Sequence, residues 1–114
     1  MRQGQITLTI PLSGSVSGDG DLGGGKIQAI SVPTITSGDL FVQGGFDTTS
    51  ASFLRLLDPG LSNQTSGGDL RFATGLGSRM IVWPQDFSTP SYVRLETAVA
   101  QAAARSFIVR FSSA

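Results

Sequence analysis

The stretch ITLTIPL, residues 6–12, decides the fold class of this chain. Apolar side chains occupy every second position from Ile6 to Leu12, and two threonines stand between the first three of them. Because side chains alternate between the two faces of a strand, this pattern predicts a half-buried β-strand. Pro11 and Ser13 are residues typical of a strand end, so the strand is expected to stop there.

Seven further short apolar runs follow, at residues 26–32, 39–43, 52–57, 69–74, 79–83, 92–97 and 106–111. Most are separated by glycine-rich or proline-rich turns, and no long helical segment lies between them. About eight short strands with such turns predict an all-β fold, either a compact antiparallel β-sandwich or a small barrel. A chain of 114 residues is expected to form one domain, residues 1–114.

Residues 13–26 interrupt the strand pattern with six glycines. Such a segment has little apolar area to bury, and glycine loses more conformational freedom on ordering than any other residue. We therefore expect a flexible Gly/Ser-rich loop or arm near the N-terminus.

The same segment contains GDGDLGGGKI, residues 18–27, which resembles a phosphate-binding loop. A Walker loop places Ser or Thr after its lysine, whereas Ile27 follows Lys26 in this chain. Phosphate loops also lead into a helix, and the following residues are strand-like. We expect no nucleotide and no cofactor.

Residue types for catalysis and metal binding are scarce, because the chain has no His and no Cys. The Ser-His-Asp, Cys-His and usual zinc arrangements are therefore excluded. Asp19 and Asp21 have the spacing of the first two calcium ligands of an EF-hand, but later ligand positions lack side-chain oxygens. We expect no metal site and a protein that is not an enzyme.

The segment ETAVAQAAAR, residues 96–105, does not fit the strand pattern. Alanine is the best helix former, so one or two helical turns are possible, but an isolated helix of this length is marginal in water. A tight Ala-rich connection between the last two strands is the alternative.

Charge is low and evenly spread, with eight basic and eight acidic residues and a charged fraction of 14%. The basic residues stand singly, which disfavours nucleic acid as a partner. No run resembles a signal peptide or a membrane helix. The low charge fits either a small turn-rich β-protein or a surface covered by a partner.

Residues 79–97, RMIVWPQDFSTPSYVRLET, hold the single Trp and the single Tyr of the chain. Aromatic and arginine side chains dominate the energetics of many protein interfaces. The candidate partner-binding residues are Arg79, Trp83, Phe87, Tyr92 and Arg94. The alternative is that the Trp and Tyr pack in the core and that the loop between them only connects strands.

The runs GDLRFATGLGSRMIVWP, residues 68–84, and FSTPSYVRLETAVAQ, residues 87–101, resemble small, cysteine-free, all-β virion proteins of tailed bacteriophages. The resemblance spans residues 36–111 and is greatest to capsid cement, or decoration, proteins. It implies a homo-oligomer, expected to be a trimer, on the capsid surface of the virion. Its partners would be the major capsid protein or other virion subunits, and it would be made in the host cytoplasm without a signal peptide.

We therefore expect a structural virion protein that binds and stabilises a phage capsid. The Gly/Ser-rich arm and the N-terminal strand could add to the sheet of a neighbouring subunit. One alternative is a carbohydrate-binding β-sandwich for receptor or surface attachment, with Trp83 and Tyr92 as stacking platforms and Asp86 and Arg94 as hydrogen-bonding groups. Another is a structural component of the phage neck or tail.

Overall fold

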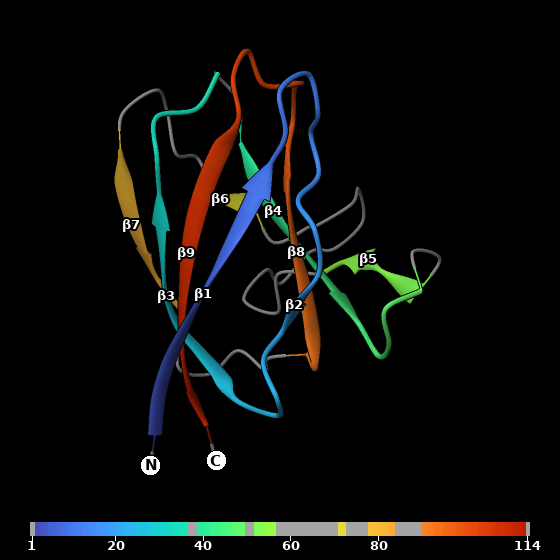
Figure 1. Cartoon of the computed structure of the whole chain (residues 1–114), viewed down its shortest axis with the longest axis vertical. Coiled ribbons are helices and arrows are strands. Elements are labelled where there is room, and N and C mark those ends of the chain that lie inside the picture. The colour runs from blue at the N-terminus through green and yellow to red at the C-terminus, as the bar shows by residue number, and fades with distance from the viewer. Residues whose placement is uncertain are drawn as a thin grey trace, which may run out of the picture.

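The computed structural model describes residues 2–36, 39–49, 52–56, 71–72, 78–83 and 90–113. These residues contain nine β-strands and no α-helix (Figure 1). The strands are β1 (Arg2–Ile10), β2 (Gly20–Asp21), β3 (Lys26–Val32), β4 (Leu40–Gly45), β5 (Leu54–Arg55), β6 (Arg71–Phe72), β7 (Arg79–Val82), β8 (Tyr92–Thr97) and β9 (Arg105–Ser113). The all-β prediction is confirmed. No helix of the described residues is long and apolar enough to cross a membrane.

Two antiparallel sheets form the sandwich (Figure 1). Sheet A has the strand order β1-β9-β3-β7, and sheet B has the order β2-β8-β4-β5, with β6 also pairing with β4. The chain changes sheet at most of its connections. This order is that of a jelly roll, a double sheet built from two Greek keys.

Sheet A is organised by β9, which pairs with β1 on one side and β3 on the other. The β1–β9 ladder runs without a break from Arg2↔Ser113 to Ile10↔Arg105, so the two ends of the chain lie side by side (Figure 1). The β3–β9 register shifts between Ile27 and Ala29. This bulge turns both Ile27 and Ile30 into the core, although they are three residues apart.

The core fills the space between the two sheets, where alternate residues of each strand point inward. The alternating stretch that begins at Ile6 supplies buried side chains at Leu8 and Ile10, as its pattern predicts. The core cluster consists of Leu8, Ile10, Leu22, Ile27, Ile30, Val32, Ile35, Leu40, Val42, Ile81, Trp83, Val93, Leu95, Phe107 and Val109.

The Gly/Ser-rich segment lies along the edge of sheet B and does not project as an arm. The Ser17 amide donates to the Leu95 carbonyl at 2.8 Å, and the Thr97 amide donates to the Ser15 carbonyl at 2.8 Å. Further along, β2 pairs with β8, and Leu22 is only 1% exposed. One buried leucine and a line of main-chain hydrogen bonds hold the glycine-rich segment on its own domain.

The Ala-rich segment forms a tight connection, and the helical alternative is wrong. Residues 96 and 97 belong to β8, and residues 98–104 contain bends without a helix. The Gln101 main chain is paired with the N-terminal segment, donating to the Gly14 carbonyl at 2.9 Å and accepting from the Ser13 amide at 2.8 Å. Because these groups are used across the domain, alanine propensity does not decide the local structure.

Candidate functional site

Trp83 lies in the core, directly after β7. It is 3% exposed, and its ring centroid lies 6.2 Å from that of Phe72. The Trp83 amide also donates to the Gln28 carbonyl at 2.9 Å. Trp83 is therefore a core residue, as the alternative interpretation of the sequence predicts. Phe87 lies outside the described residues.

The remaining three candidate residues divide between the two sheets. Arg79 is exposed on β7 of sheet A, opposite Val32 of β3. Tyr92 and Arg94 are half-buried on β8 of sheet B, separated by the inward-facing Val93. The structure thus brings Tyr92 and Arg94 to one face and places Arg79 and Trp83 elsewhere.

Arg94 is stacked on an aromatic ring of the outer face of sheet B. Its guanidinium carbon lies 4.0 Å from the centroid of Phe53, and its Nε donates to Oδ1 of Asp19. Phe53 precedes β5 and lies over Gly45 of β4. The guanidinium is therefore fixed between a ring and a carboxylate, an arrangement that combines cation–π and charge-assisted hydrogen bonding.

A second arginine on the same face repeats this arrangement. The guanidinium carbon of Arg55 lies 3.9 Å from the ring centroid of Phe41. Its Nε and Nη2 donate to the two carboxylate oxygens of Glu96 at 2.9 and 2.6 Å. Gln43 also donates to Glu96, at 2.9 Å. Side chains from two strands thus hold Glu96: Gln43 of β4, and Arg55 of β5, which binds both carboxylate oxygens.

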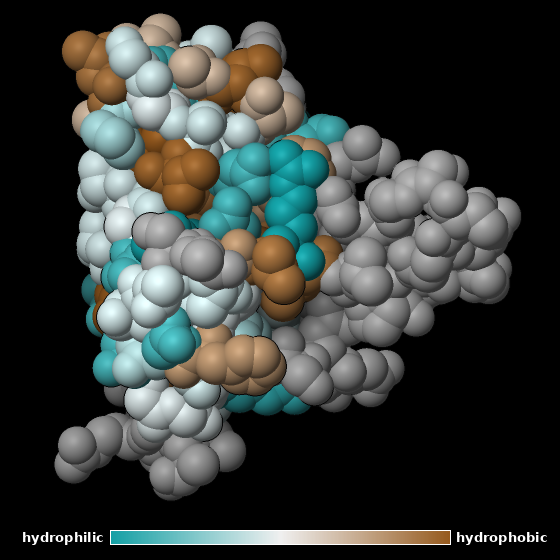
Figure 2. All heavy atoms as spheres, turned by 90° about the vertical axis from the view of Figure 1, so that its right-hand side faces the viewer, coloured by the Kyte–Doolittle hydropathy of each residue, from teal (hydrophilic) through white to brown (hydrophobic). Residues whose placement is uncertain are grey.

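We call these residues the Arg–Phe face, which comprises Asp19, Phe41, Gln43, Phe53, Arg55, Arg94 and Glu96. It forms because β4 and β8 turn alternate residues outward, and the register sets Gln43 opposite both Arg55 and Arg94. Figure 2 views the side of the molecule on which β2, β8 and β5 lie in Figure 1. Hydrophilic side chains gather in the middle of this side, with hydrophobic ones next to them.

The charges of the Arg–Phe face balance, because two arginines pair with two carboxylates. Stacking and pairing also fix the long arginine side chains before any partner binds. Phe41 and Phe53 are themselves buried, so the face offers guanidinium groups held in place over the rings, with little conformational entropy left to lose, which suits binding to another protein surface.

Glu96 makes the Arg–Phe face sensitive to acid. The Arg55 hydrogen bonds are the main cause that lowers the pKa of Glu96 below its ordinary value of 4.5, and Gln43 adds to the effect against desolvation. A lowered carboxyl pKa stabilises the fold above the unfolded-state pKa, and this contribution is lost as pH falls through the folded-state pKa. We expect Glu96→Gln to lower the free energy of unfolding by about 0.5 kcal/mol at pH 7.

The measurement is denaturant unfolding of the wild type and Glu96→Gln between pH 7 and pH 3. The difference between the two proteins should be largest above pH 4.5 and should shrink as the pH falls from 4.5 through the lowered pKa of folded Glu96. A difference that is constant across this range would show that the charge of Glu96 has no role.

The aspartates of the glycine-rich segment are engaged within the chain. Asp19 binds Arg94, and Oδ1 of Asp21 accepts a hydrogen bond from the Gly23 amide at 2.8 Å. Across the described ranges, no group of three or more His, Cys, Asp or Glu residues could hold a metal ion. Gly23 and Gly24 have positive φ values of 57° and 80°, so this turn requires glycine for its backbone geometry.

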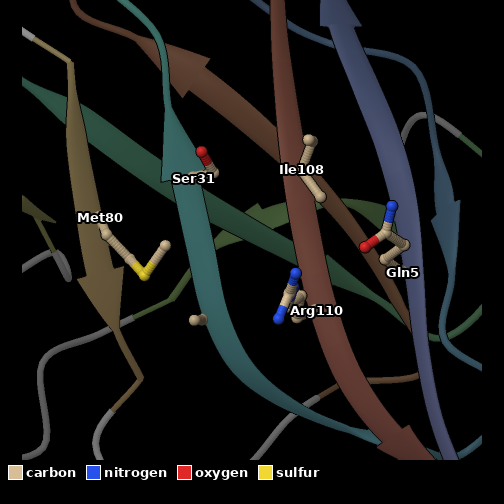
Figure 3. A pocket seen from close by; sticks show the side chains of 6 residues that line it. Gln5, Ser31, Met80, Ile108 and Arg110 are labelled. Carbon is tan, nitrogen blue, oxygen red and sulfur yellow. The ribbon is translucent and has the colours of Figure 1, made fainter.

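A second surface lies on the outer face of sheet A. The small side chains of Ala29 and Ser31 on β3 form the floor of a groove of about 200 Å³. Met80 of β7 borders it on one side, and Ile108 and Arg110 of β9 border it on the other (Figure 3). We call this depression the sheet A groove, and Gln5 of β1 completes its lining.

No family model, no curated protein and no solved structure matches the chain.

Sequence reasoning identified Arg94, and Tyr92 two residues before it on β8, but missed the other members of the Arg–Phe face. Arg55 and Glu96 are 41 residues apart, and Arg94 and Asp19 are 75 apart. The sequence pattern predicts where strands lie but not which strands are neighbours in a sheet, so it cannot show that residues so far apart in the chain are in contact. The available signal was the alternation in residues 92–97, which predicts that Tyr92, Arg94 and Glu96 share one face.

Proposed function

We propose that this protein is a structural subunit of a tailed-bacteriophage particle that binds and stabilises the capsid through protein–protein contacts. The observation that carries the proposal is an exposed apolar surface on a folded sandwich. On β7, Met80 and Val82 are 65% and 75% exposed, and the register sets them beside Ser31 and Ala29 of β3. Contiguous apolar surface of this kind marks interaction sites.

The Arg–Phe face supports the same role on the opposite sheet. Its charges are neutralised within the chain, and its two phenylalanines are stacked under arginines. Interface centres are enriched in arginine and aromatic side chains. A subunit with one such surface on each sheet can contact two neighbours at once, and several weak contacts together give durable attachment.

The choice of the capsid as the binding partner rests on the resemblance of residues 36–111 to cement proteins. The proposed partner is the major capsid protein or another virion subunit, and no catalytic step is involved. The jelly-roll fold is compatible with this role because viral capsid domains use it, but lectins use it as well.

The proposal is tested by immunogold electron microscopy of purified particles produced from the phage genome that encodes the chain. Labelling distributed over the head would support the capsid role. Labelling confined to the neck or tail would favour the alternative virion component, and particles from the same genome with the gene deleted serve as the control. Wild-type particles without label would contradict a role in the virion.

The carbohydrate-binding alternative loses its main platform because Trp83 is buried. Trp83 is the only tryptophan, so intrinsic tryptophan fluorescence reports on this residue alone. We expect a blue-shifted emission that acrylamide quenches weakly and that a panel of host-surface glycans does not change. A glycan that quenches or shifts this emission in a saturable manner would contradict the expectation.

A further inference from the structure

Phe46 is the most exposed large apolar side chain of the described residues. It follows the last residue of β4 and is 93% exposed. A phenylalanine in water forgoes the burial energy that makes aromatic side chains the main contributors to many interfaces. Its position at the end of a strand presents the ring as a protruding anchor.

The turn that follows Phe46 is held by its own hydrogen bonds. Oδ1 of Asp47 accepts from the Thr49 amide at 2.8 Å, and the Ser52 hydroxyl donates to the Thr49 carbonyl at 2.8 Å. The Ser52 amide donates to the same carbonyl at 2.9 Å. Because Asp47, Thr49 and Ser52 are already joined by hydrogen bonds, docking Phe46 costs little further ordering of these residues.

The sheet A groove has the size and lining to receive such a ring. Its volume is about 200 Å³, and an apolar cavity of roughly 150 Å³ holds benzene. Met80 and Ile108 supply apolar walls, and Figure 3 shows them on opposite sides of Ser31. A phenyl ring bound between these walls would cover Ala29 and Ser31, which form the floor of the groove.

Charge complementarity points to the same pairing. Asp47 is adjacent to Phe46 and exposed, and the Thr49 amide, followed by the Ser52 hydroxyl, lowers the pKa of its carboxyl. Arg110 at the rim of the groove is exposed and has no ion-pair partner within the described part of the chain. An anchor with a neighbouring carboxylate therefore matches a groove with a neighbouring guanidinium.

A single chain cannot make this contact with itself. Phe46 follows a strand of sheet B, whereas the groove opens on the outer face of sheet A, so both layers of the sandwich lie between them. We infer that Phe46 of one copy inserts into the sheet A groove of a second copy, with Asp47 facing Arg110. Because the two surfaces differ, repetition of the contact builds a closed oligomer when the geometry permits closure.

The first test is the mass of the purified chain in solution, measured by light scattering at concentrations up to about 1 mM. We expect a concentration-dependent oligomer for the wild type and the 11.9 kDa monomer for Phe46→Ser. The dissociation constant of the contact should rise at least 30-fold, as expected for removal of an interface hot spot. Leu12→Ser removes another exposed apolar side chain, one that does not line the groove, and should associate like the wild type.

The second test uses the asymmetry of the contact. Ala29→Trp fills the groove and Ile108→Lys places a charge in it, and each should also give monomers while retaining a free Phe46. Phe46→Ser retains a free groove, so a fluorescently labelled Phe46→Ser chain should bind unlabelled Ala29→Trp or Ile108→Lys and should not bind unlabelled Phe46→Ser. Circular dichroism and thermal unfolding identify the groove variant that remains folded.

These experiments use the isolated chain, so their outcome is independent of the proposed attachment to a capsid. A wild type that is monomeric at all concentrations would overturn the inference. So would a Phe46→Ser variant that keeps the wild-type mass, or a mixture of folded variants in which labelled Phe46→Ser fails to bind.

Discussion

Gly25→Ala is expected to destabilise the domain by about 3 kcal/mol. A Cβ atom at this position would lie 2.5 Å from the Ser112 carbonyl oxygen and 2.9 Å from the Leu22 carbonyl oxygen. Both are main-chain atoms, one in β9 and one in the turn before Gly25, so neither can move without shifting a strand or the turn. The measurement is urea unfolding of the wild type and the variant.

Gly18→Ala is the matched control from the same segment. Nothing lies within 4 Å of a Cβ atom at Gly18, and its φ is not positive. This variant should unfold within about 0.5 kcal/mol of the wild type, or with slightly higher stability because alanine restricts the unfolded chain. Equal effects of the two substitutions would contradict the packing of Gly25 between β9 and the turn.

The structural roles of these glycines also account for the glycine-rich motif of residues 18–27. The motif resembles a phosphate loop in sequence, but its glycines serve the packing and backbone geometry of the sandwich edge. Gly20 faces Ile6 and Leu8 of β1, where a Cβ would lie 2.7 Å from the Ile6 Cδ1 atom. Gly23 and Gly24 adopt positive φ in the turn. A close approach and a tight turn require glycine here without any ligand.

Gln101→Ala is expected to cost about 2–3 kcal/mol, because several hydrogen bonds are lost at a buried position. Gln101 is 1% exposed, and its Oε1 accepts from the Thr36 amide at 2.8 Å and from Nε of Arg105 at 3.3 Å. Its Nε2 donates to the Val99 carbonyl at 3.1 Å. Truncation leaves the Thr36 amide and the Val99 carbonyl without this partner.

Gln28→Ala is the control for this prediction, since the Gln28 side chain is exposed on β3 and only its main chain bonds Trp83. It should change the free energy of unfolding by less than about 0.5 kcal/mol. Thermal unfolding followed by circular dichroism compares the two variants. If Gln101→Ala were as stable as Gln28→Ala, the side-chain hydrogen bonds of Gln101 would not stabilise the connection between β8 and β9.

The fold class was predictable because the strands carry their own pattern. The alternation at residues 6–12 gives the burial of Leu8 and Ile10 directly. The expected runs at residues 79–83 and 92–97 contain β7 and β8, and the expected runs 26–32 and 106–111 lie within β3 and β9. Local periodicity reports on side-chain burial, which is why these strands could be found in a single sequence.

What could not be predicted depends on contacts between distant segments. The strand β2 has two residues and almost no apolar pattern, and it exists because β8, about seventy residues later, supplies main-chain partners. The alanines of residues 98–104 favour a helix locally, yet Gln101 is held by Gly14 and Thr36. In both cases tertiary hydrogen bonds override local propensity.

The candidate surface was predictable only in part for the same reason. Aromatic composition singled out Trp83, but burial of the ring depends on the packing of β7 against the opposite sheet. Phe46 and the groove lined by Ala29 and Ser31 carried no sequence signal, because small residues on a central strand form a groove only when larger neighbours flank them.

The copy number of this protein in purified phage particles tests the proposed structural role most directly. Quantitative mass spectrometry gives the molar ratio of the chain to the major capsid protein. A capsid-binding subunit should be present in many copies, in a fixed ratio to the capsid protein that survives repeated purification in high salt. Absence from the particles, or a ratio that falls toward zero with each purification step, would contradict it.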